Sequence, residues 1–213
     1  MNTNEKFVIT ISREVGSGGC TVGRKLAEKL GVRYCDKQLI DKLVDTFGLS
    51  VENIERIKGE KKNWLTDILE KVSPVPQAGA IGSTVNIYQS ETIGDRVFRI
   101  ESEILMQLAE EGSCVIAGRS GFFVLRNCPN KVDVFITASP VNRVKRVMEK
   151  QNLSEKEAEE VIAKVDKMRE NYVSHYSGKS RYDSRNYDLV INMDNISEDG
   201  AVELILNYIN YGK

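Results

Sequence analysis

The segment "FVITISREVGSGGCTVGRK", residues 7–25, constrains the fold more than any other part of the chain. Its first six residues are rich in β-branched side chains, which is typical of a buried parallel strand. A glycine-rich turn follows, and apolar residues then recur at helical spacing from Val22 to Leu30, before Gly31, which can end a helix. A strand, a glycine-rich turn and a helix in this order form the layout of a phosphate-binding loop.

Such a loop binds phosphate through backbone N–H groups at a helix N-terminus, and its glycines permit close approach and positive φ angles. A run such as "GSGG" can also be only a turn, but its place between a strand and a helix favours phosphate binding. The Thr21 hydroxyl can meet Mg²⁺ or a phosphate oxygen. We therefore expect ATP phosphates on Gly16, Ser17, Gly18, Gly19, Cys20 and Thr21, with Mg²⁺ held at Thr21 through the phosphates.

The literal pattern G-x-x-x-x-G-K-[ST] is absent, and two registers come close to it. In the first, which we prefer, Arg13 takes the first glycine position, Gly18 takes the second, and Gly19 stands where the lysine belongs. In the second, Gly18 and Gly23 are the paired glycines and Arg24 replaces the lysine. The second register leaves five extra residues after the strand and puts Gly23 inside an apolar-periodic helix.

The missing lysine leaves a positive charge to be supplied from elsewhere. Arg24 and Lys25 lie three and four residues past Thr21, about one helical turn from the helix start, and their side chains lean back toward it. Arg13 leaves the strand end at the mouth of the loop. We expect Arg13 to replace the lysine, with the helix N-terminus and the backbone N–H groups sharing the task.

The rest of the chain continues the alternation of strands and helices. Further strands are predicted at 32–35, 114–118, 132–138 and 187–192, and further helices after Asp36 and at 93–111, 140–151, 154–173 and 197–209. This order predicts an α/β protein, a P-loop three-layer α/β/α fold with a mostly parallel sheet, in a single domain over residues 1–213. Residues 48–90 are less regular, and are either a long helical excursion or, as we favour, an inserted piece that covers a substrate.

Composition excludes several classes of partner. Lys and Arg number 30 against 31 Asp and Glu, so the net charge of the chain is near zero and does not favour binding to nucleic acid or to an anionic membrane. The four cysteines form no C-x-x-C pair and the single histidine is His175, which argues against a zinc site. No apolar run approaches the length that spans a membrane, and the N-terminus has no secretory signal pattern. We expect a cytoplasmic protein whose partners are small molecules.

The second half of the chain carries a local excess of cations. Arg119 follows the strand at 114–118, and ligands bind at the carboxyl ends of strands in such sheets. Residues 139–185 hold 11 Lys and Arg against 8 Asp and Glu. At Arg119 the alternative is a surface ion pair, which its position at the strand end makes the less favoured interpretation. For the helix pair the alternative is a solvated surface, which we accept for the Glu-rich run at 155–160; for the arginines, a mobile cationic lid over phosphates is at least as well supported. The arginines in question are Arg143, Arg146, Arg169, Arg181 and Arg185.

Several linked segments resemble the cytidylate kinase-like branch of the P-loop nucleoside monophosphate kinases. The matching pieces are "ITISREVGSGGCTVGRKLAEKLGVRYCDKQLI", "CVIAGRSGFFVL", "VDVFITASPVNRVKRV" and "KMRENYVSHYSGKSRYDSRNYDLVIN". They come in the family's order and cover both ends of the chain. The resemblance implies a core, a monophosphate-binding insertion at 37–92 and a helical lid at 143–185, with ATP as donor and Mg²⁺ as its metal.

The resemblance also implies roles for single residues. Asp36 matches a position lining the monophosphate site, and Arg119 matches an arginine that grips the acceptor phosphate. Gly19, at the kinase lysine, and Ser120, where cytidylate kinases have an acidic residue, depart from the family pattern. With Arg13, expected from its place at the strand end, the candidate catalytic residues are Arg13, Arg119, Arg146 and Arg169. With Arg181 and Arg185 from the cationic segment, the candidate acceptor-binding residues are Asp36, Arg119, Arg181 and Arg185.

Together these features predict ATP-dependent phosphoryl transfer to a nucleoside monophosphate. Phosphoryl transfer needs positioning and positive charge more than covalent chemistry, and arginine binds phosphate with two bonds. The rival hypothesis is a nucleotide-binding regulator that has lost catalysis, because Gly19 occupies the lysine position. A third is transfer to another small acceptor.

Overall fold

A five-stranded parallel sheet organises the protein, of which the computed structural model describes residues 1–36 and 93–211. The strands are β1 (Val8–Arg13), β2 (Arg33–Cys35), β3 (Cys114–Ala117), β4 (Lys131–Thr137) and β5 (Leu189–Asn192), in the order β2-β3-β1-β4-β5. The helices are α1 (Gly19–Leu30), α5 (Ile93–Glu111), α6 (Gly121–Val124), α7 (Pro140–Gln151), α8 (Glu155–Ser177) and α9 (Glu198–Tyr211), with a 3₁₀ turn, η1 (Ser184–Asn186).

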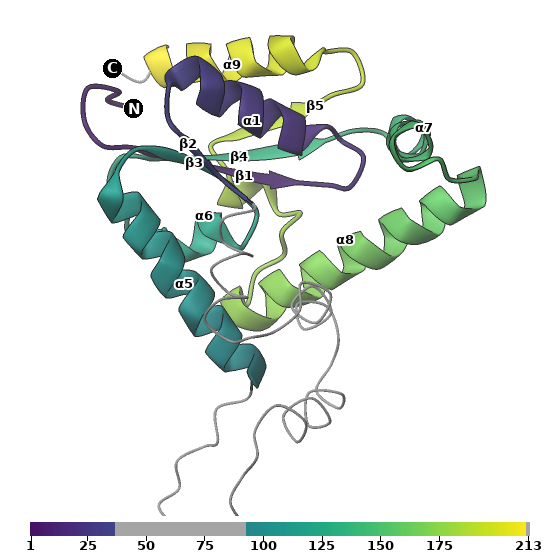
Figure 1. Cartoon of the computed structure of the whole chain (residues 1–213), viewed down its shortest axis with the longest axis horizontal. Coiled ribbons are helices and arrows are strands. Elements are labelled where there is room, and N and C mark those ends of the chain that lie inside the picture. The colour runs from purple at the N-terminus through teal and green to yellow at the C-terminus, as the bar shows by residue number, and fades with distance from the viewer. Residues whose placement is uncertain (37–92, 212–213) are drawn as a thin grey trace, which may run out of the picture.

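Helices cover both faces of the sheet and make three layers (Figure 1). Alternate residues of a strand point to opposite faces, so β1 contributes to two cores. Ile9 and Ile11 pack with α1 and α9 in one cluster, whereas Val8 packs with α5 in the other. All three are at most 1% exposed, so β1 is buried on both faces, as its continuous apolar run predicts.

The order of the strands places the end of β1 at the centre of the molecule. β1 pairs with β3 on one side and with β4 on the other, and all these pairings are parallel. The carboxyl ends of the three strands therefore meet at one edge, where α/β sheets bind ligands. α7 lies beyond this edge, and the long helix α8 returns from it beneath the sheet (Figure 1).

The predicted α/β class, the parallel sheet and its strands are confirmed. Ser139 caps α7 with Pro140 at its start, and Ser154 and Glu157 form the predicted capping box of α8. α8 runs on to Ser177, past the predicted end near Val173 and into the expected loop. The short α6 was not predicted, because four residues show no periodicity. The expected insertion at 37–92 lies outside the described residues.

Two further features bear on the earlier expectations. In the described part of the chain, no helix is both long enough and apolar enough to pass through a membrane. All four cysteines lie in this part, and each is a free thiol.

Candidate nucleotide site

The loop between β1 and α1 has the backbone shape that its glycines permit. Gly16 and Gly18 have φ angles of 79° and 86°, in the left-handed region. A Cβ on Gly16 would lie 2.5 Å from the carbonyl oxygen of Arg143, and one on Gly18 would lie 3.1 Å from the guanidinium of Arg146. Helix α7 thus packs directly against the loop, and a side chain at Gly16 would push it away.

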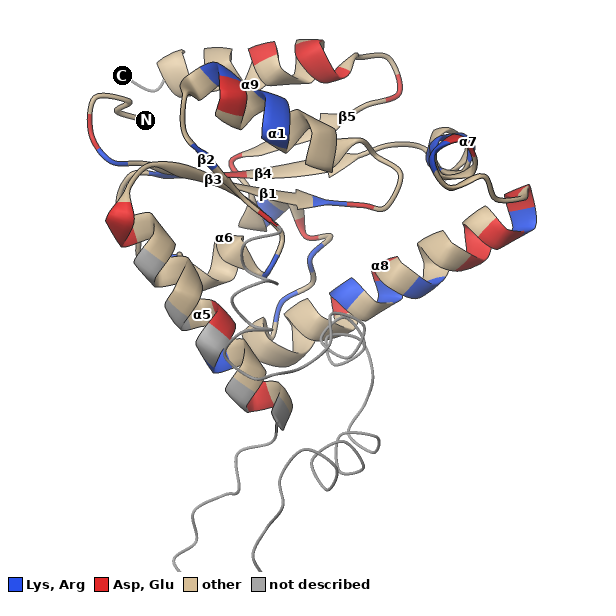
Figure 2. Cartoon of the chain, viewed as in Figure 1, with Lys and Arg blue, Asp and Glu red and all other residues tan. Residues whose placement is uncertain are grey.

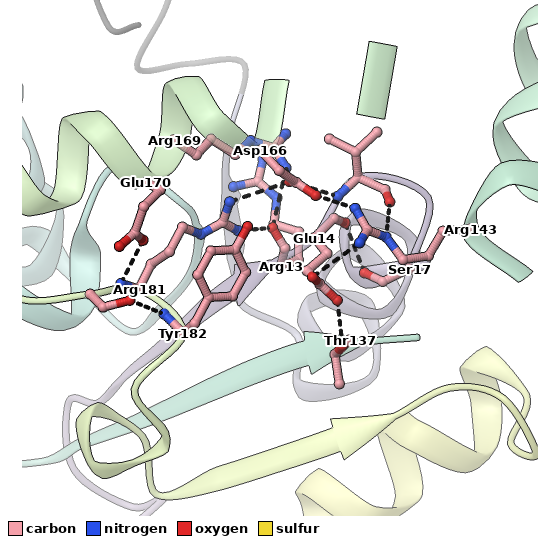
Figure 3. A network of polar contacts seen from close by, with 12 residues as sticks. Arg13, Glu14, Ser17, Thr137, Arg143, Asp166, Arg169, Glu170, Arg181 and Tyr182 are labelled. Atoms are coloured by element: carbon pink, nitrogen blue, oxygen red, sulfur yellow. Dashed lines mark hydrogen bonds and ion pairs between the residues drawn. The ribbon is translucent and has the colours of Figure 1, made fainter. Parts of the chain in front are cut away.

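A buried polar network joins the loop to the neighbouring helices (Figure 3). Asp166 of α8 accepts a hydrogen bond from the backbone N–H of Val15 at 3.1 Å and ion-pairs with Arg143 and Arg181. Arg143 also donates to the Val15 carbonyl at 2.7 Å and to Glu14 at 3.0 Å. Because these charges are buried and paired, removal of one would leave its partners uncompensated. The network therefore fixes the loop to α7 and α8.

Two cavities open at this edge of the sheet. We call the first the loop cavity; it is lined by Arg13, Glu14, Val15, Gly16, Gly18, Gly19, Cys20, Thr21, Arg146, Val147, Lys150, Gln151 and Arg169. We call the second the strand-end cavity; it is lined by Ser12, Arg13, Asp36, Ala117, Gly118, Arg119, Ser120, Val165, Met168, Arg169, Tyr172, Val173 and Arg181. Arg13 and Arg169 line both cavities. The two arginines therefore stand at the junction between them.

Arg13 is held on three sides. Its Nε donates to the sulfur of Cys20 at 3.3 Å, and its Nη2 lies 3.9 Å from a carboxylate oxygen of Asp36. Its Nη1 fills the space beside Gly118, where a Cβ would overlap it. Burial opposes the charge of Arg13, but Cys20 and Asp36 outweigh it and raise the pKa of Arg13 above its ordinary value. The guanidinium is thus charged and aimed from the loop toward the end of β3.

Arg169 approaches the same junction from α8. Its Nη1 donates to the backbone carbonyl of Arg13 at 3.2 Å, and Arg181 donates to the same oxygen. Burial, together with the neighbouring cations Arg13 and Arg181, lowers the pKa of Arg169 to about 10. At neutral pH Arg169 remains charged; it shares Asp166 as a counterion with Arg181, whereas Arg13 pairs with Asp36. Such a concentration of positive charge favours an anionic ligand.

Arg146 lies against the opposite wall of the loop cavity. Its guanidinium sits over Gly18 and forms an ion pair with Glu198 at the start of α9. The hydrogen bond from Arg146 lowers the pKa of Glu198 below its ordinary value. Figure 2 shows the wider pattern: Lys and Arg mark α7, the middle of α8 and the segment between α8 and β5, whereas acidic residues mark the starts of α8 and α9.

The end of β3 has an uncommon backbone. Gly118, Arg119 and Ser120 have φ angles of 82°, 58° and 54°, and two of these residues carry side chains that disfavour this region. Arg119 ion-pairs with the buried Glu101 at 3.1 Å, and the Tyr172 hydroxyl donates to the same carboxylate. Burial, with Glu101 close by, raises the pKa of Tyr172 well above its ordinary value.

Ser120 has a buried hydroxyl at this turn. The residue is 5% exposed and lines the strand-end cavity, and its Oγ has no hydrogen-bond partner among the described residues. It precedes α6, yet its side chain makes no capping bond to that helix. Buried hydroxyls are ordinarily bonded, so this one is available to a ligand in the cavity.

Most residues predicted for the site are brought together. Ser17 is an exception, because it lines neither cavity and its hydroxyl donates to the carbonyl of Glu14 at 2.9 Å. Arg185 is the other: its side chain is 88% exposed, pairs with Asp183 at 2.7 Å and lines neither cavity. Arg181 lines the strand-end cavity, but it is only 3% exposed and pairs with Asp166 in the buried polar network. Asp166, which pairs with Arg181, and Glu101, which pairs with Arg119, were not predicted, since single carboxylates in helices give no sequence signal.

The fit of Mg²⁺ to these residues is limited. In the preferred register the position after Gly19, where the motif has its hydroxyl, is Cys20, and sulfur is a poor ligand for Mg²⁺. Thr21 follows it and is the one hydroxyl among the described residues of the loop cavity. Thr21 thus offers a single oxygen, and Mg²⁺ commonly completes its coordination with water and nucleotide phosphates.

A parallel sheet with a glycine loop between β1 and α1 and arginines at the strand ends defines a P-loop protein of the kinase type. The comparison with known families is more specific: residues 8–195 match the model of the cytidylate kinase-like family, and the chain belongs to that family. Membership supports a nucleotide kinase as the class of function.

Relatives of known name agree with this assignment. The chain is 25% identical to a cytidylate kinase of Sulfurisphaera tokodaii over 207 residues, covering 96% of each chain. It is 32% identical to a cytidylate kinase of Thermotoga sp. over 158 residues, covering 66% of this chain and 68% of that one.

Solved structures show the same fold. An uncharacterized protein from Eubacterium ventriosum superposes with a TM-score of 0.69 at 26% identity, covering 96% of this chain and 99% of that one. A shikimate kinase from Bacteroides thetaiotaomicron superposes with a TM-score of 0.56 at 15% identity, covering 97% of this chain and 99% of that one, and shares the fold alone.

Proposed function

We propose that the protein transfers the γ-phosphoryl group of ATP to a nucleoside monophosphate. The observation that carries this proposal is the junction of the two cavities, because Arg13 and Arg169 line both of them. A triphosphate on the loop and an acceptor at the strand ends would place their phosphates on either side of these two cations. Kinase reactions need this arrangement, in which donor, acceptor and positive charge are held in line.

In the proposed reaction an oxygen of the acceptor phosphate bonds to the γ-phosphorus of ATP. The bond from that phosphorus to the β–γ bridging oxygen breaks, and ADP leaves. An acceptor phosphate oxygen is already ionised at neutral pH, so no general base is needed. This agrees with a site built from arginines, in which His175, 60% exposed beside Asp95, takes no part.

The chain's residues would then act by position and charge. The N–H groups of Gly16 to Thr21 would hold the donor phosphates at the start of α1. Arg146, Arg13 and Arg169 would neutralise charge on the phosphates, and Arg119 would bind the acceptor. Mg²⁺, when bound, supplies further neutralisation on the donor phosphates, with Thr21 as the protein's oxygen ligand.

We propose CMP as the first acceptor to test and the cytoplasm as the setting. The named cytidylate kinases among the relatives support CMP. Ser120 stands where the resemblance leads one to expect an acidic residue, so other monophosphates belong in the same panel. The four free thiols agree with a reducing compartment. Helices α7 and α8 would form the lid.

A second hypothesis is a nucleotide-binding regulator without turnover, and Gly19 at the lysine position favours it. Measurement of ADP release from MgATP with CMP, dCMP, UMP, AMP and GMP separates the two. We expect ADP release that depends on one or a few of these acceptors and falls at least tenfold in Arg169→Ala. Lys25→Ala, which removes only an exposed ion pair with Asp199, is the matched control. ATP binding without acceptor-dependent ADP release would favour the regulator.

A further inference from the structure

The side chain of Arg13 occupies the space that a side chain at position 19 would need. A Cβ on Gly19 would lie 2.5 Å from the Cβ of Arg13, closer than two such atoms can approach, and 3.1 Å from the Cβ of Ile136. Gly19 has no positive φ that would call for glycine. Among the described contacts, the crowding by Arg13 is therefore the strongest reason for a glycine at this position.

The two positions are those at which an ordinary phosphate loop has its first glycine and its lysine. The first glycine leaves room at the strand end, and the lysine that follows the second glycine supplies the charge. Here the large cationic side chain stands at the strand end and the glycine stands at the helix start. The guanidinium of Arg13 reaches Cys20 and Asp36, so it lies at the junction of the two cavities and not along the loop.

We propose that Arg13 and Gly19 have exchanged the roles of the glycine and the lysine of the phosphate loop, so that Arg13 is the residue that binds the phosphoryl group in transfer. The proposal deepens the proposed function, on which it rests by taking ATP as the ligand of the loop cavity. The charge of Arg13 would then act at the junction of the two cavities. A guanidinium between the two cavities can contact donor and acceptor phosphates at once, through N–H groups on different edges of its plane.

The steric half of the proposal is tested without any ligand. Gly19→Ala should lower the midpoint of thermal unfolding by roughly 3–8 °C, since overpacking a buried site is destabilising. In an Arg13→Gly background the same change should cost less than half as much, because the closest contact, at 2.5 Å, is gone while the contact with Ile136 at 3.1 Å remains. Gly112→Ala is the matched control, since a Cβ there meets nothing within 4 Å. An equal cost of Gly19→Ala in both backgrounds would overturn the exchange.

The functional half is tested by the affinity for MgATP, measured from its stabilisation of the folded protein or by calorimetry. Arg13→Ala should bind MgATP roughly fivefold or more weakly, as expected for loss of a charge-assisted contact, while Lys25→Ala stays within about twofold of the wild type. The double variant Arg13→Gly/Gly19→Lys restores the first glycine and the lysine of the ordinary motif. It should bind MgATP at least fivefold more tightly than Arg13→Gly alone.

The outcomes separate this proposal from the proposed function. Wild-type affinity in Arg13→Ala, or no recovery in the double variant, overturns the exchange. A greater loss in Arg24→Ala than in Arg13→Ala overturns it in favour of the second register. If the affinities follow the expectation but no monophosphate gives ADP release, the exchange of roles in ATP binding stands, and the proposed transfer fails together with the part of Arg13 in it.

Discussion

Two features of Ser120 are unfavourable for the stability of the folded protein. Its backbone lies in the left-handed region with a φ of 54°, and its buried hydroxyl has no partner among the described residues. Each feature costs the folded state free energy, on the order of 1 kcal/mol or more. Such unfavourable features cluster at functional sites, where contacts with a ligand can offset their free-energy cost. Ser120 faces the strand-end cavity, and we expect its hydroxyl to bond the acceptor.

Ser120→Ala should separate stability from binding. Removal of an unbonded buried hydroxyl should leave the free energy of unfolding unchanged or raise it by up to about 1 kcal/mol, because a desolvation cost disappears. The KM for the acceptor should rise about fivefold, the loss expected for one neutral hydrogen bond, while the KM for ATP stays the same. Urea unfolding and steady-state kinetics measure the two effects. A destabilised variant with unchanged kinetics would show that the hydroxyl is structural.

The ion pair between Arg146 and Glu198 should make stability depend on pH. The pKa of Glu198 is lowered from 4.5 in the folded state, so the pair stabilises the protein above that pH. The stabilisation, about 0.5–1 kcal/mol for a partly exposed pair, is lost as the pH falls through the folded-state pKa. The difference in unfolding free energy between wild type and Glu198→Gln should therefore be largest near neutral pH and vanish in acid. A difference that grows toward low pH would contradict the assignment.

Helix α8 is divided into two parts with different surroundings. Its second half carries Asp166, Tyr172 and Val173, all buried against the loop, the strand ends and α5. Its first half, residues 155–164, buries Ala158 and exposes most of its other side chains. The first half packs with α7, which carries Arg146 and Lys150 on the wall of the loop cavity.

We predict that nucleotide binding protects the first half of α8 more than the second. Without ligand, amides of residues 155–164 should exchange with solvent faster than those of 166–177, because fewer buried contacts hold them. Saturating MgATP should slow the exchange of 155–164 at least fivefold, since phosphates bound beside Arg146 and Lys150 would restrain α7 and, through it, the first half of α8. Hydrogen exchange followed by mass spectrometry measures this. Identical exchange with and without MgATP would exclude these helices as a lid.

The sequence predicts most of the described elements because their signals are local. Hydrophobic runs identify the strands, and Pro140 and the Ser154–Glu157 pair identify helix starts to within a residue. The site is predicted less completely. The glycine loop and Arg119 follow from their positions after strands, but the contacts made by Asp166 and Glu101 join segments far apart in the chain. Long-range pairing of this kind leaves no periodicity, so Arg185 and Arg181 could not be told apart in advance.

The proposed binding of two anions would depend on the assembled protein, since β1 and α8 together supply the cations between the cavities. ATP at 100 times its dissociation constant should add about 2.7 kcal/mol to the free energy of unfolding. With Arg13 and Arg169 between them, two phosphate groups repel each other little. A nonhydrolysable ATP analogue should therefore leave the affinity for the acceptor unchanged or increase it.

Arg169→Ala should reverse this coupling. With one of the two shared cations gone, the bound analogue should weaken acceptor binding about fivefold, a coupling of about 1 kcal/mol, and the acceptor should weaken the analogue equally. Calorimetric titration of each ligand in the presence and absence of the other gives both values. Arg146→Ala is a suitable comparison, because Arg146 lines the loop cavity but not the strand-end cavity. Equal coupling in both variants would show that Arg169 does not act between the ligands.

The crowding between positions 13 and 19 also limits how such a loop can arise by descent. A lysine at 19 and an arginine at 13 would overlap, so an ancestor with the ordinary motif could not gain Arg13 first without distorting the loop. A route without this overlap replaces the lysine with glycine first, so that glycine stands at both positions 13 and 19 before the arginine appears. That intermediate would carry neither charge. The arginine would then have been selected in a protein whose phosphate binding had already weakened, and reversion would have to pass through the same weak form.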